Sequence, residues 1–197
     1  MNFKSLPASI LIAIGGLLIL ASSIPLICDF FPILTFPNGQ LTFWGTRLPN
    51  RVTITQINGW TLIGFAGYEV AAFYMLVGAV ALLVAFNTYQ NVLPVEDIKG
   101  IPINSIASIV FGILDLGLIL LIYIAPIDNP NGWGFSPLSN FTLLSGNNTY
   151  NQSGRIIGAT LGIGFLFLVV GAVLIILGGL INFVLKPSTS SKAHISA

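Results

Sequence analysis

The sequence TLIGFAGYEVAAFYMLVGAVALLVAF, residues 61–86, decides the fold class of this chain. As a helix it is long enough to cross about 30 Å of hydrocarbon, a distance that takes roughly 20 apolar residues. Each apolar run of this length in the chain is bounded by polar residues or prolines. Three further runs meet the same condition: residues 6–27, 103–125 and 156–185. We therefore predict one membrane domain, residues 1–197, with four transmembrane helices.

The composition supports this prediction and excludes several classes of function. Only 7% of the residues are charged and mean hydropathy is +0.94, whereas roughly 25% of the residues in soluble proteins are charged. A net charge of +1 gives no reason to expect a nucleic-acid partner. The one cysteine, Cys28, excludes an internal disulfide, and the one histidine, His194, lies in a polar tail. We expect no metal site, no cofactor and, because no nucleophile–base constellation is present, no enzymatic activity.

The first run has an alternative interpretation as a secretory signal, because Lys4 precedes it and small residues follow its apolar centre. Signal peptides have apolar centres of 7–15 residues, and this run continues to Ile27. We therefore expect the first run to be retained as a membrane helix.

The orientation prediction depends on the stretch NFTLLSGNNTYNQS, residues 140–153, which carries three glycosylation sequons at Asn140, Asn147 and Asn151. N-glycans are attached in accessible loops on the outer side of the membrane. We therefore assign residues 28–60 and 126–155 to outer loops and residues 87–102 to an inner loop. Both termini, including the tail 186–197, are then cytoplasmic, in a cell-membrane glycoprotein. The alternative is an outer loop that is never glycosylated. The orientation would then depend on an excess of only one basic residue on the cytoplasmic side.

The first outer loop has the alternating pattern of a β-hairpin. We predict that residues 41–44 pair with residues 52–57 across the turn-prone TRLPN, and that residues 141–144 add a strand. Three tryptophans near the span ends are interpreted as membrane-interface anchors, or alternatively as a recognition surface: Trp44, Trp60 and Trp133.

Small residues recur at spacings of seven along the spans, which keeps them on one helix face. Such a face lets helix backbones approach in a membrane, where lipid provides no hydrophobic drive for association. We predict a tightly packed antiparallel four-helix bundle, although glycine is common in membrane helices in any case. The predicted packing residues are Ala8, Gly15, Ser22, Gly64, Ala71, Gly78, Gly158, Gly162, Gly164, Gly171 and Gly178.

Two acids, Glu69 and Asp115, lie within the spans, and no basic residue in any span can pair with them. Counted from the outer span ends, they lie roughly 12 Å and 15 Å deep, so the two carboxyls are expected to be able to meet. Glu69 is nevertheless almost opposite Ala71 on its helix and is expected to point outward. Three roles remain open: hydrogen bonding between helices, a proton or cation path, or contact with a partner subunit.

The layout of four spans, inner termini and a larger, β-like first outer loop resembles that of claudins. The resemblance is confined to the layout. Claudins carry a tryptophan and a cysteine pair in that loop, whereas this chain has Trp44 but no cysteine pair. The resemblance therefore implies neither family membership nor adhesion residues.

These observations favour a non-enzymatic structural, assembly or accessory subunit of a membrane complex. Its expected partners are the lipid bilayer and copies of itself or other membrane proteins. A proton- or cation-linked transporter or channel component that uses Glu69 and Asp115 is the alternative. A further alternative is a cofactor-free subunit of a respiratory or oxidase complex.

Overall fold

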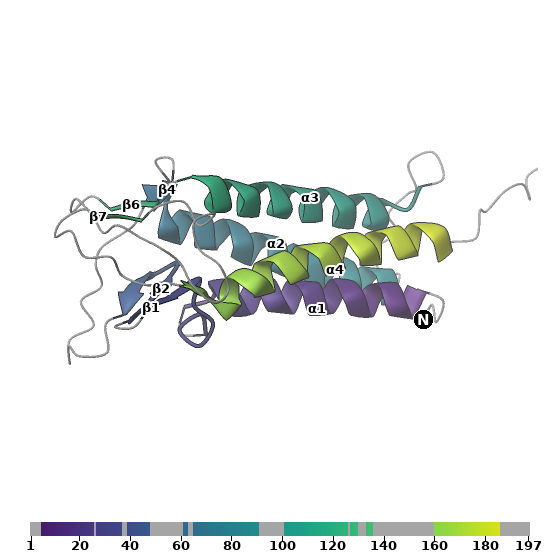
Figure 1. The fold of residues 1–197 in the computed structure, drawn as a ribbon. Helices are drawn as coiled ribbons and strands as arrows, with labels where there is room; N and C mark the ends of the chain where they lie inside the picture. The colour runs from purple at the N-terminus through teal and green to yellow at the C-terminus, as the bar shows by residue number, and fades with distance from the viewer. Residues whose placement is uncertain are drawn as a thin grey trace, which may run out of the picture.

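The computed structural model describes residues 5–25, 27–36, 39–47, 61–62, 65–90, 101–125, 127–129, 133–135 and 160–185. Four helices in this part of the chain are long and apolar enough to span a membrane: α1 (Leu6–Ser23), α2 (Gly67–Gln90), α3 (Ile103–Ile124) and α4 (Ile163–Leu185). The helices lie side by side, and short strands gather at one end of them (Figure 1). The protein is therefore mostly helical with a small β component.

Helix α1 is shorter than its apolar run. It ends at Ser23, and Ile24 has extended backbone angles, φ −69° and ψ 133°. A residue before a proline is disfavoured in the helical region because the proline ring crowds its backbone, and Pro25 follows Ile24. Pro25 thus ends the helix four residues before the predicted boundary at Ile27. Helix α3, by contrast, falls one residue short of its predicted range of 103–125.

Helices α2 and α4 begin later than their apolar runs because described residues near the start of each run form strands. Strands β4 (Thr61–Leu62) and β5 (Phe65–Ala66) pair with each other before α2 begins at Gly67. Strand β8 (Thr160–Leu161) precedes α4, which begins at Ile163 rather than at the predicted residue 156. Apolar residues satisfy the hydropathy criterion in either conformation, so hydropathy alone placed these boundaries incorrectly.

The described strands form two antiparallel four-stranded sheets. One has the order β3-β2-β1-β8 and contains β1 (Leu34–Phe36), β2 (Gly39–Thr42) and β3 (Gly45–Arg47). The other has the order β5-β4-β6-β7 and contains β6 (Ile127–Asn129) and β7 (Trp133–Phe135). Each sheet joins strands that lie between α1 and α2 to strands that lie between α3 and α4. Both connecting segments are thereby tied together at the same end of the helices.

The predicted hairpin partner of residues 41–44 is wrong. Strand β2 pairs with β1 on one side and with β3 on the other, so both of its edges are occupied. The chain reverses through a two-residue loop at Phe43 and Trp44, which places Thr42 opposite Gly45. The turn therefore comes earlier than the TRLPN stretch. Residues 52–57 and 141–144 lie outside the described residues.

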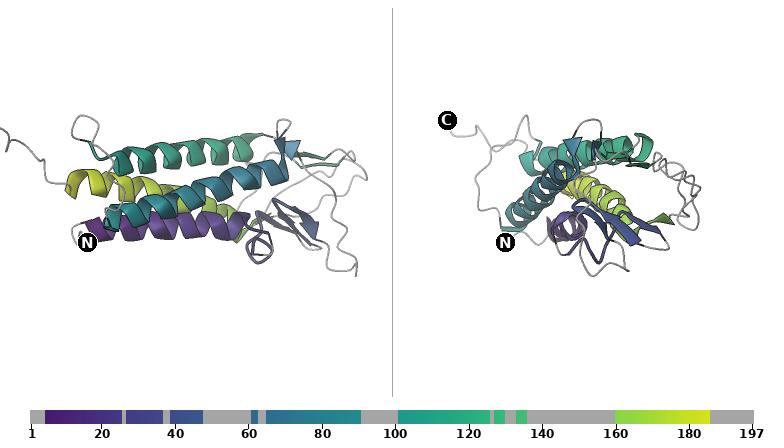
Figure 2. Two further views of the ribbon diagram at one scale, coloured as in Figure 1. Left: turned by 180° about the vertical axis from the view of Figure 1, so that it is seen from behind. Right: turned by 90° about the vertical axis from the view of Figure 1, so that its left-hand side faces the viewer.

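Backbone contacts through glycine hold α1 against α4 and α2. A Cβ atom at Gly15 would lie 2.6 Å from the carbonyl oxygen of Gly171, and one at Gly16 would lie 2.9 Å from that of Gly78. Helix α3 packs mainly on α4 and to a smaller extent on α2, as the views in Figure 2 show. The predicted packing residues that the structure describes are all buried: Ala8, Gly15, Ser22, Ala71, Gly78, Gly162, Gly164, Gly171 and Gly178. Gly64 and Gly158 lie outside the described residues.

Gly162 and Gly164 have a different role from the one predicted for them. A Cβ atom at Gly162 would collide with the carbonyl of Pro32, and one at Gly164 with the carbonyl of Phe31. The Gly162 N–H donates to the Ile33 carbonyl at 2.7 Å, and the Gly164 N–H donates to the Pro32 carbonyl at 3.0 Å. These two glycines therefore seat the segment after α1 on the start of α4, and neither makes a helix–helix contact of the kind found at Gly15.

Candidate functional site

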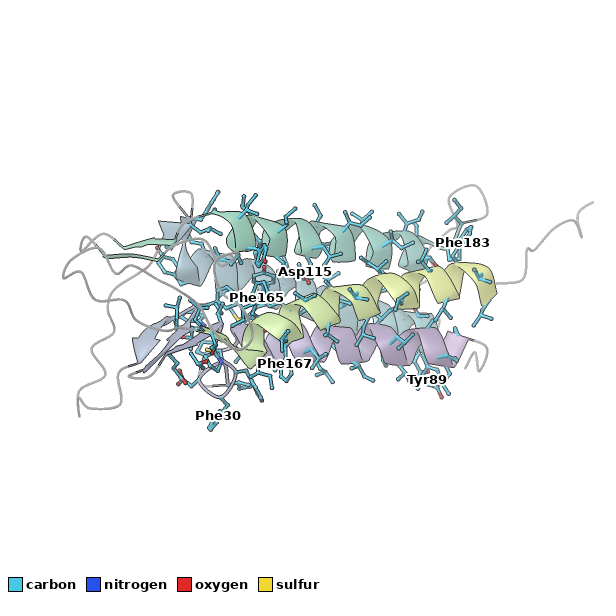
Figure 3. All side chains as sticks on the ribbon, in the orientation of Figure 1. Phe30, Tyr89, Asp115, Phe165, Phe167 and Phe183 are labelled. Atoms are coloured by element: carbon cyan, nitrogen blue, oxygen red, sulfur yellow. The ribbon has the colours of Figure 1, made fainter. Side chains whose placement is uncertain are left out.

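The strongest candidate for a functional group is Asp115, which is completely buried near the middle of α3. One turn earlier on α3, a Cβ atom at Gly112 would lie 2.5 Å from the Ile176 side chain and 3.1 Å from the Ala172 carbonyl of α4. This close approach brings the Asp115 side of α3 against its neighbours. Figure 3 shows the carboxyl on the side of α3 that faces the other helices.

Helix α2 contributes the second polar group, the hydroxyl of Tyr74, whose side chain is also completely buried. The Tyr74 ring packs against Phe43, with 5.2 Å between ring centroids, and against Phe73 at 6.0 Å. Phe43 comes from the two-residue loop between β2 and β3. One sheet therefore contacts the helix that carries the tyrosine, and tertiary packing holds this ring in place.

Both carboxyl oxygens of Asp115 and the hydroxyl of Tyr74 are buried without a hydrogen-bond partner among the described residues. The sequences of the four helices contain no lysine, arginine or histidine to neutralise a carboxylate. Burying an unpaired charge is far more costly than burying a neutral carboxyl, so these surroundings favour the neutral form of the side chain. Chemically, the pair offers two hydroxyl donors and their acceptor oxygens in an apolar surrounding.

The structure does not bring Glu69 and Asp115 together. Glu69 is exposed in the first turn of α2, and its Oε2 accepts a hydrogen bond from the Ala66 N–H at 2.9 Å. Because α2 begins at Gly67, Glu69 lies about 3 Å along the helix instead of roughly 12 Å. An acid at this position satisfies a free N–H and interacts favourably with the helix dipole. Glu69 therefore caps α2 here.

A second group of polar contacts, which the sequence analysis did not identify, joins the helices at the end that lies away from the β-sheets. The hydroxyls of Ser5 and Ser9 on the α1 side donate to the Thr88 and Ala85 carbonyls of α2 at 2.8 Å and 2.7 Å. The start of α1 therefore lies beside the end of α2. The signal in the sequence was a recurrence of Ser and Asn near one end of each apolar run.

Side-chain amides join α3 to α4 and to α2 at this same end. The Asn182 amide of α4 donates to the Ser105 hydroxyl at 2.9 Å, and the Asn87 amide of α2 donates to the side-chain oxygen Oδ1 of Asn104 at 3.2 Å. Such interhelical hydrogen bonds are typical of helices packed in lipid, where each contributes about 0.6 kcal/mol on average.

The remaining predicted sites are only partly within the described residues. Trp44 is partly exposed, and its indole N–H donates to the Ser23 carbonyl at 2.8 Å, at the end of α1. The three sequon asparagines and Trp60 lie outside the described residues. Within the described ranges, no group of three or more His, Cys, Asp or Glu residues is placed to hold a metal ion.

Comparisons of the chain with protein-family models, with curated proteins and with solved structures found no match.

Proposed function

We propose that this protein spans a membrane as an antiparallel four-helix bundle and acts as a non-enzymatic structural or accessory subunit of a membrane complex. In this proposal the β-sheets and the segment with Asn140, Asn147 and Asn151 face the exterior of the cell membrane. Both termini lie in the cytoplasm. The partners are the bilayer and other copies of this chain or other membrane proteins.

Membrane insertion is supported by the apolar side chains that all four helices expose. In water such a surface would drive aggregation, whereas lipid tails accommodate it. Each helix contributes exposed residues, for example Leu17 on α1, Leu83 on α2, Ile113 on α3 and Val170 on α4.

The spacing of exposed aromatic residues along α2 also supports insertion. Tyr68 and Phe86 are both exposed near opposite ends of this helix. Eighteen residues separate them in the chain, which corresponds to about 27 Å at the helical rise. This spacing is close to the roughly 30 Å thickness of the hydrocarbon layer. Tyrosine is enriched at the boundaries of this layer, whereas phenylalanine is favoured in its apolar interior.

The observation that carries the structural role is the glycine packing of α1 against α4 and α2. At Gly15–Gly171 and Gly16–Gly78 the helix backbones are in contact, so one helix cannot slide past the other without separating. A scaffold needs this rigidity, whereas a transporter must move its helices during each cycle.

Helix α3 provides the surface for a partner. In its most apolar 18-residue stretch, 33% of the residues are buried, against 44% in α1 and in α4. The exposed side of α3 carries Val110, Ile113, Leu114 and Leu120. A second membrane helix can cover this side without disturbing the glycine contacts.

Native mass spectrometry of the protein released from its own membranes in mild detergent tests the proposal. We expect a defined complex heavier than the 21.0 kDa chain, and we expect Ile113→Trp and Leu120→Trp to dissociate it. Leu17→Trp, on the exposed side of α1, is the matched control. A monomer under all mild conditions would contradict the structural role.

A second experiment tests the orientation independently. A glycosidase should lower the apparent mass of the protein, and this shift should decrease stepwise when Asn140, Asn147 and Asn151 are changed to Gln. In a chain with Cys28→Ser, cysteines introduced into residues 136–155 should react with an impermeant reagent in intact cells. Reaction only after cell lysis would contradict the orientation.

One observation favours a second candidate function. The buried Asp115 carboxyl has no partner among the described residues, and an acid within a membrane helix is a default candidate for proton or cation transfer. In liposomes, Asp115→Asn should then abolish proton or cation flux, whereas Glu69→Gln should leave it intact because Glu69 caps α2. Flux that is unchanged in Asp115→Asn would remove this candidate.

A further inference from the structure

The segment after α1 forms a compact turn with two unlike faces. Its inner face carries Cys28, which is buried, and Phe31, whose ring packs on Phe167 of α4 with 4.9 Å between centroids. Its outer face carries Ile27 and Phe30, which are 41% and 79% exposed. In Figure 3 the Phe30 side chain points away from the rest of the molecule. Two large apolar side chains are therefore held outward by a turn that is anchored on its other side.

Hydrogen bonds within and beside the turn satisfy much of its backbone. The N–H groups of Cys28, Phe30 and Phe31 donate to the carbonyls of Ile24, Ile27 and Cys28 at 3.0 Å each. The Asp29 carbonyl accepts from the Gln40 side chain at 2.7 Å. Backbone that faces lipid must have its polar groups satisfied within the protein, and these bonds satisfy part of that requirement for the turn.

The position of the turn matches the boundary of the apolar layer. The carbonyls of Phe31 and Pro32 contact Gly164 and Gly162 at the start of α4, so the turn lies level with the first turn of that helix. The exposed side chain of Ile163 lies at this same level on α4, and exposed Leu17 lies six residues, or about 9 Å, before the end of α1. Phe30 therefore extends the apolar surface of the helices sideways at one end of the molecule.

We propose that the turn of residues 27–31 is a lipid-binding element that lies in the outer leaflet, with Ile27 and Phe30 inserted at the boundary between headgroups and acyl chains. This inference rests on the proposed membrane insertion of the helices and adds a contact outside them. Aromatic and aliphatic side chains at this depth gain from burial in the membrane. The turn widens the footprint of the protein in the outer leaflet.

Spin labelling in liposomes of phosphatidylcholine tests the proposal. In a chain with Cys28→Ser, a nitroxide at Phe30→Cys is compared with one at Leu17→Cys, and collisions with oxygen and with a water-soluble nickel chelate are measured. We expect oxygen collisions to exceed nickel collisions several-fold at both positions, with a smaller ratio at residue 30 because it lies nearer the headgroups.

The outcomes separate the two proposals. A lipid-like ratio at residue 17 with a water-like ratio at residue 30 would overturn the lipid-binding turn alone, whereas a water-like ratio at residue 17 would overturn membrane insertion itself. Should Cys28→Ser disturb the fold, Phe30→Trp in the otherwise native chain gives a second measurement. Its added fluorescence should be quenched by phosphatidylcholine brominated on the acyl chains, and absence of quenching would overturn the proposal.

Discussion

Helix α1 meets its neighbours through glycine, whereas α2 and α3 each bury a polar side chain, a tyrosine and an acid. At Gly15–Gly171 the backbones of α1 and α4 touch, and Gly16 and Gly78 bring α1 similarly close to α2. Tyr74 of α2 and the Asp115 carboxyl of α3 are buried, and their polar atoms have no partner among the described residues.

The difference shows how one chain can combine rigidly packed helices with buried polar groups that are available for hydrogen bonding. Contacts through glycine gain from dispersion and lose no side-chain entropy, which makes them strong in lipid. An unpaired buried polar group lowers the free energy of unfolding, because it loses its hydrogen bonds to water and gains none in the protein. The contacts of α1 are therefore expected to contribute most to the free energy of unfolding. The packing of α3 is expected to be the part of the bundle that binding of a partner or a proton can change.

The largest effect is expected where two backbones touch. Gly15→Leu places a branched side chain against the Gly171 carbonyl, which cannot move without displacing α4. We expect the free energy of unfolding to fall by about 3 kcal/mol or more, at or beyond the upper end for overpacked sites. Unfolding from mild detergent with a denaturing detergent measures it, and an unchanged midpoint would contradict the contact.

An increase in the free energy of unfolding is expected when the buried acid of α3 is replaced by an apolar residue. Asp115→Val removes two unsatisfied oxygens and should raise the free energy of unfolding by about 1–2 kcal/mol, the order of the desolvation penalty it relieves. Asp115→Asn, which keeps the shape and polarity, is the control and should change it little. Destabilisation by Asp115→Val would show that the carboxyl has a bonded partner and would remove the contrast between the two interfaces.

A smaller effect is expected for the hydrogen bond that joins α3 to α4. A double-mutant cycle with Ser105→Ala and Asn182→Leu should give a coupling energy of about 0.6 kcal/mol, the average for such bonds in membranes. The same unfolding measurement provides all four corners of the cycle. Zero coupling would show that this end of α3 is held by packing alone.

The smallest effect is expected at Gly117 on α3. A Cβ atom there would meet nothing within 4 Å, so Gly117→Ala should carry no steric cost and should change the free energy of unfolding only by the helix preference of alanine over glycine, about 0.5 kcal/mol in the stabilising direction. This variant is the matched control for Gly15→Leu. A large loss would mean that α3 is as tightly packed as α1.

The helical part of the fold could be predicted because the information for it is local. Apolar runs located all four helices, and α3 falls within one residue of its predicted end. The residues that open α2 and α4 were assigned incorrectly because strand formation depends on partners elsewhere in the chain. Leu62 pairs with Ile127, for example, and no pattern near Leu62 indicates this partner.

The candidate site could be predicted only in part for the same reason. Asp115 was identifiable as an acid in an apolar run, and its chemistry follows from the lack of basic residues in the spans. The sequence left open whether the acid could meet Tyr68 or Tyr74, because nothing in the sequence shows which faces of α2 and α3 meet. The capping role of Glu69 became evident only when the start of α2 was known to be Gly67.

The pairing of β1 with β8 has a consequence for the order in which the protein matures. Thr35 and Thr160 share a hydrogen bond at 2.7 Å although they are 125 residues apart in the chain. A ribosome releases β1 first, and its neighbour on that side emerges about 125 residues later. Until then one edge of β1 stays open to other strands, an aggregation-prone condition. A chain truncated before residue 160 should therefore be a preferred client of chaperones and quality-control proteases.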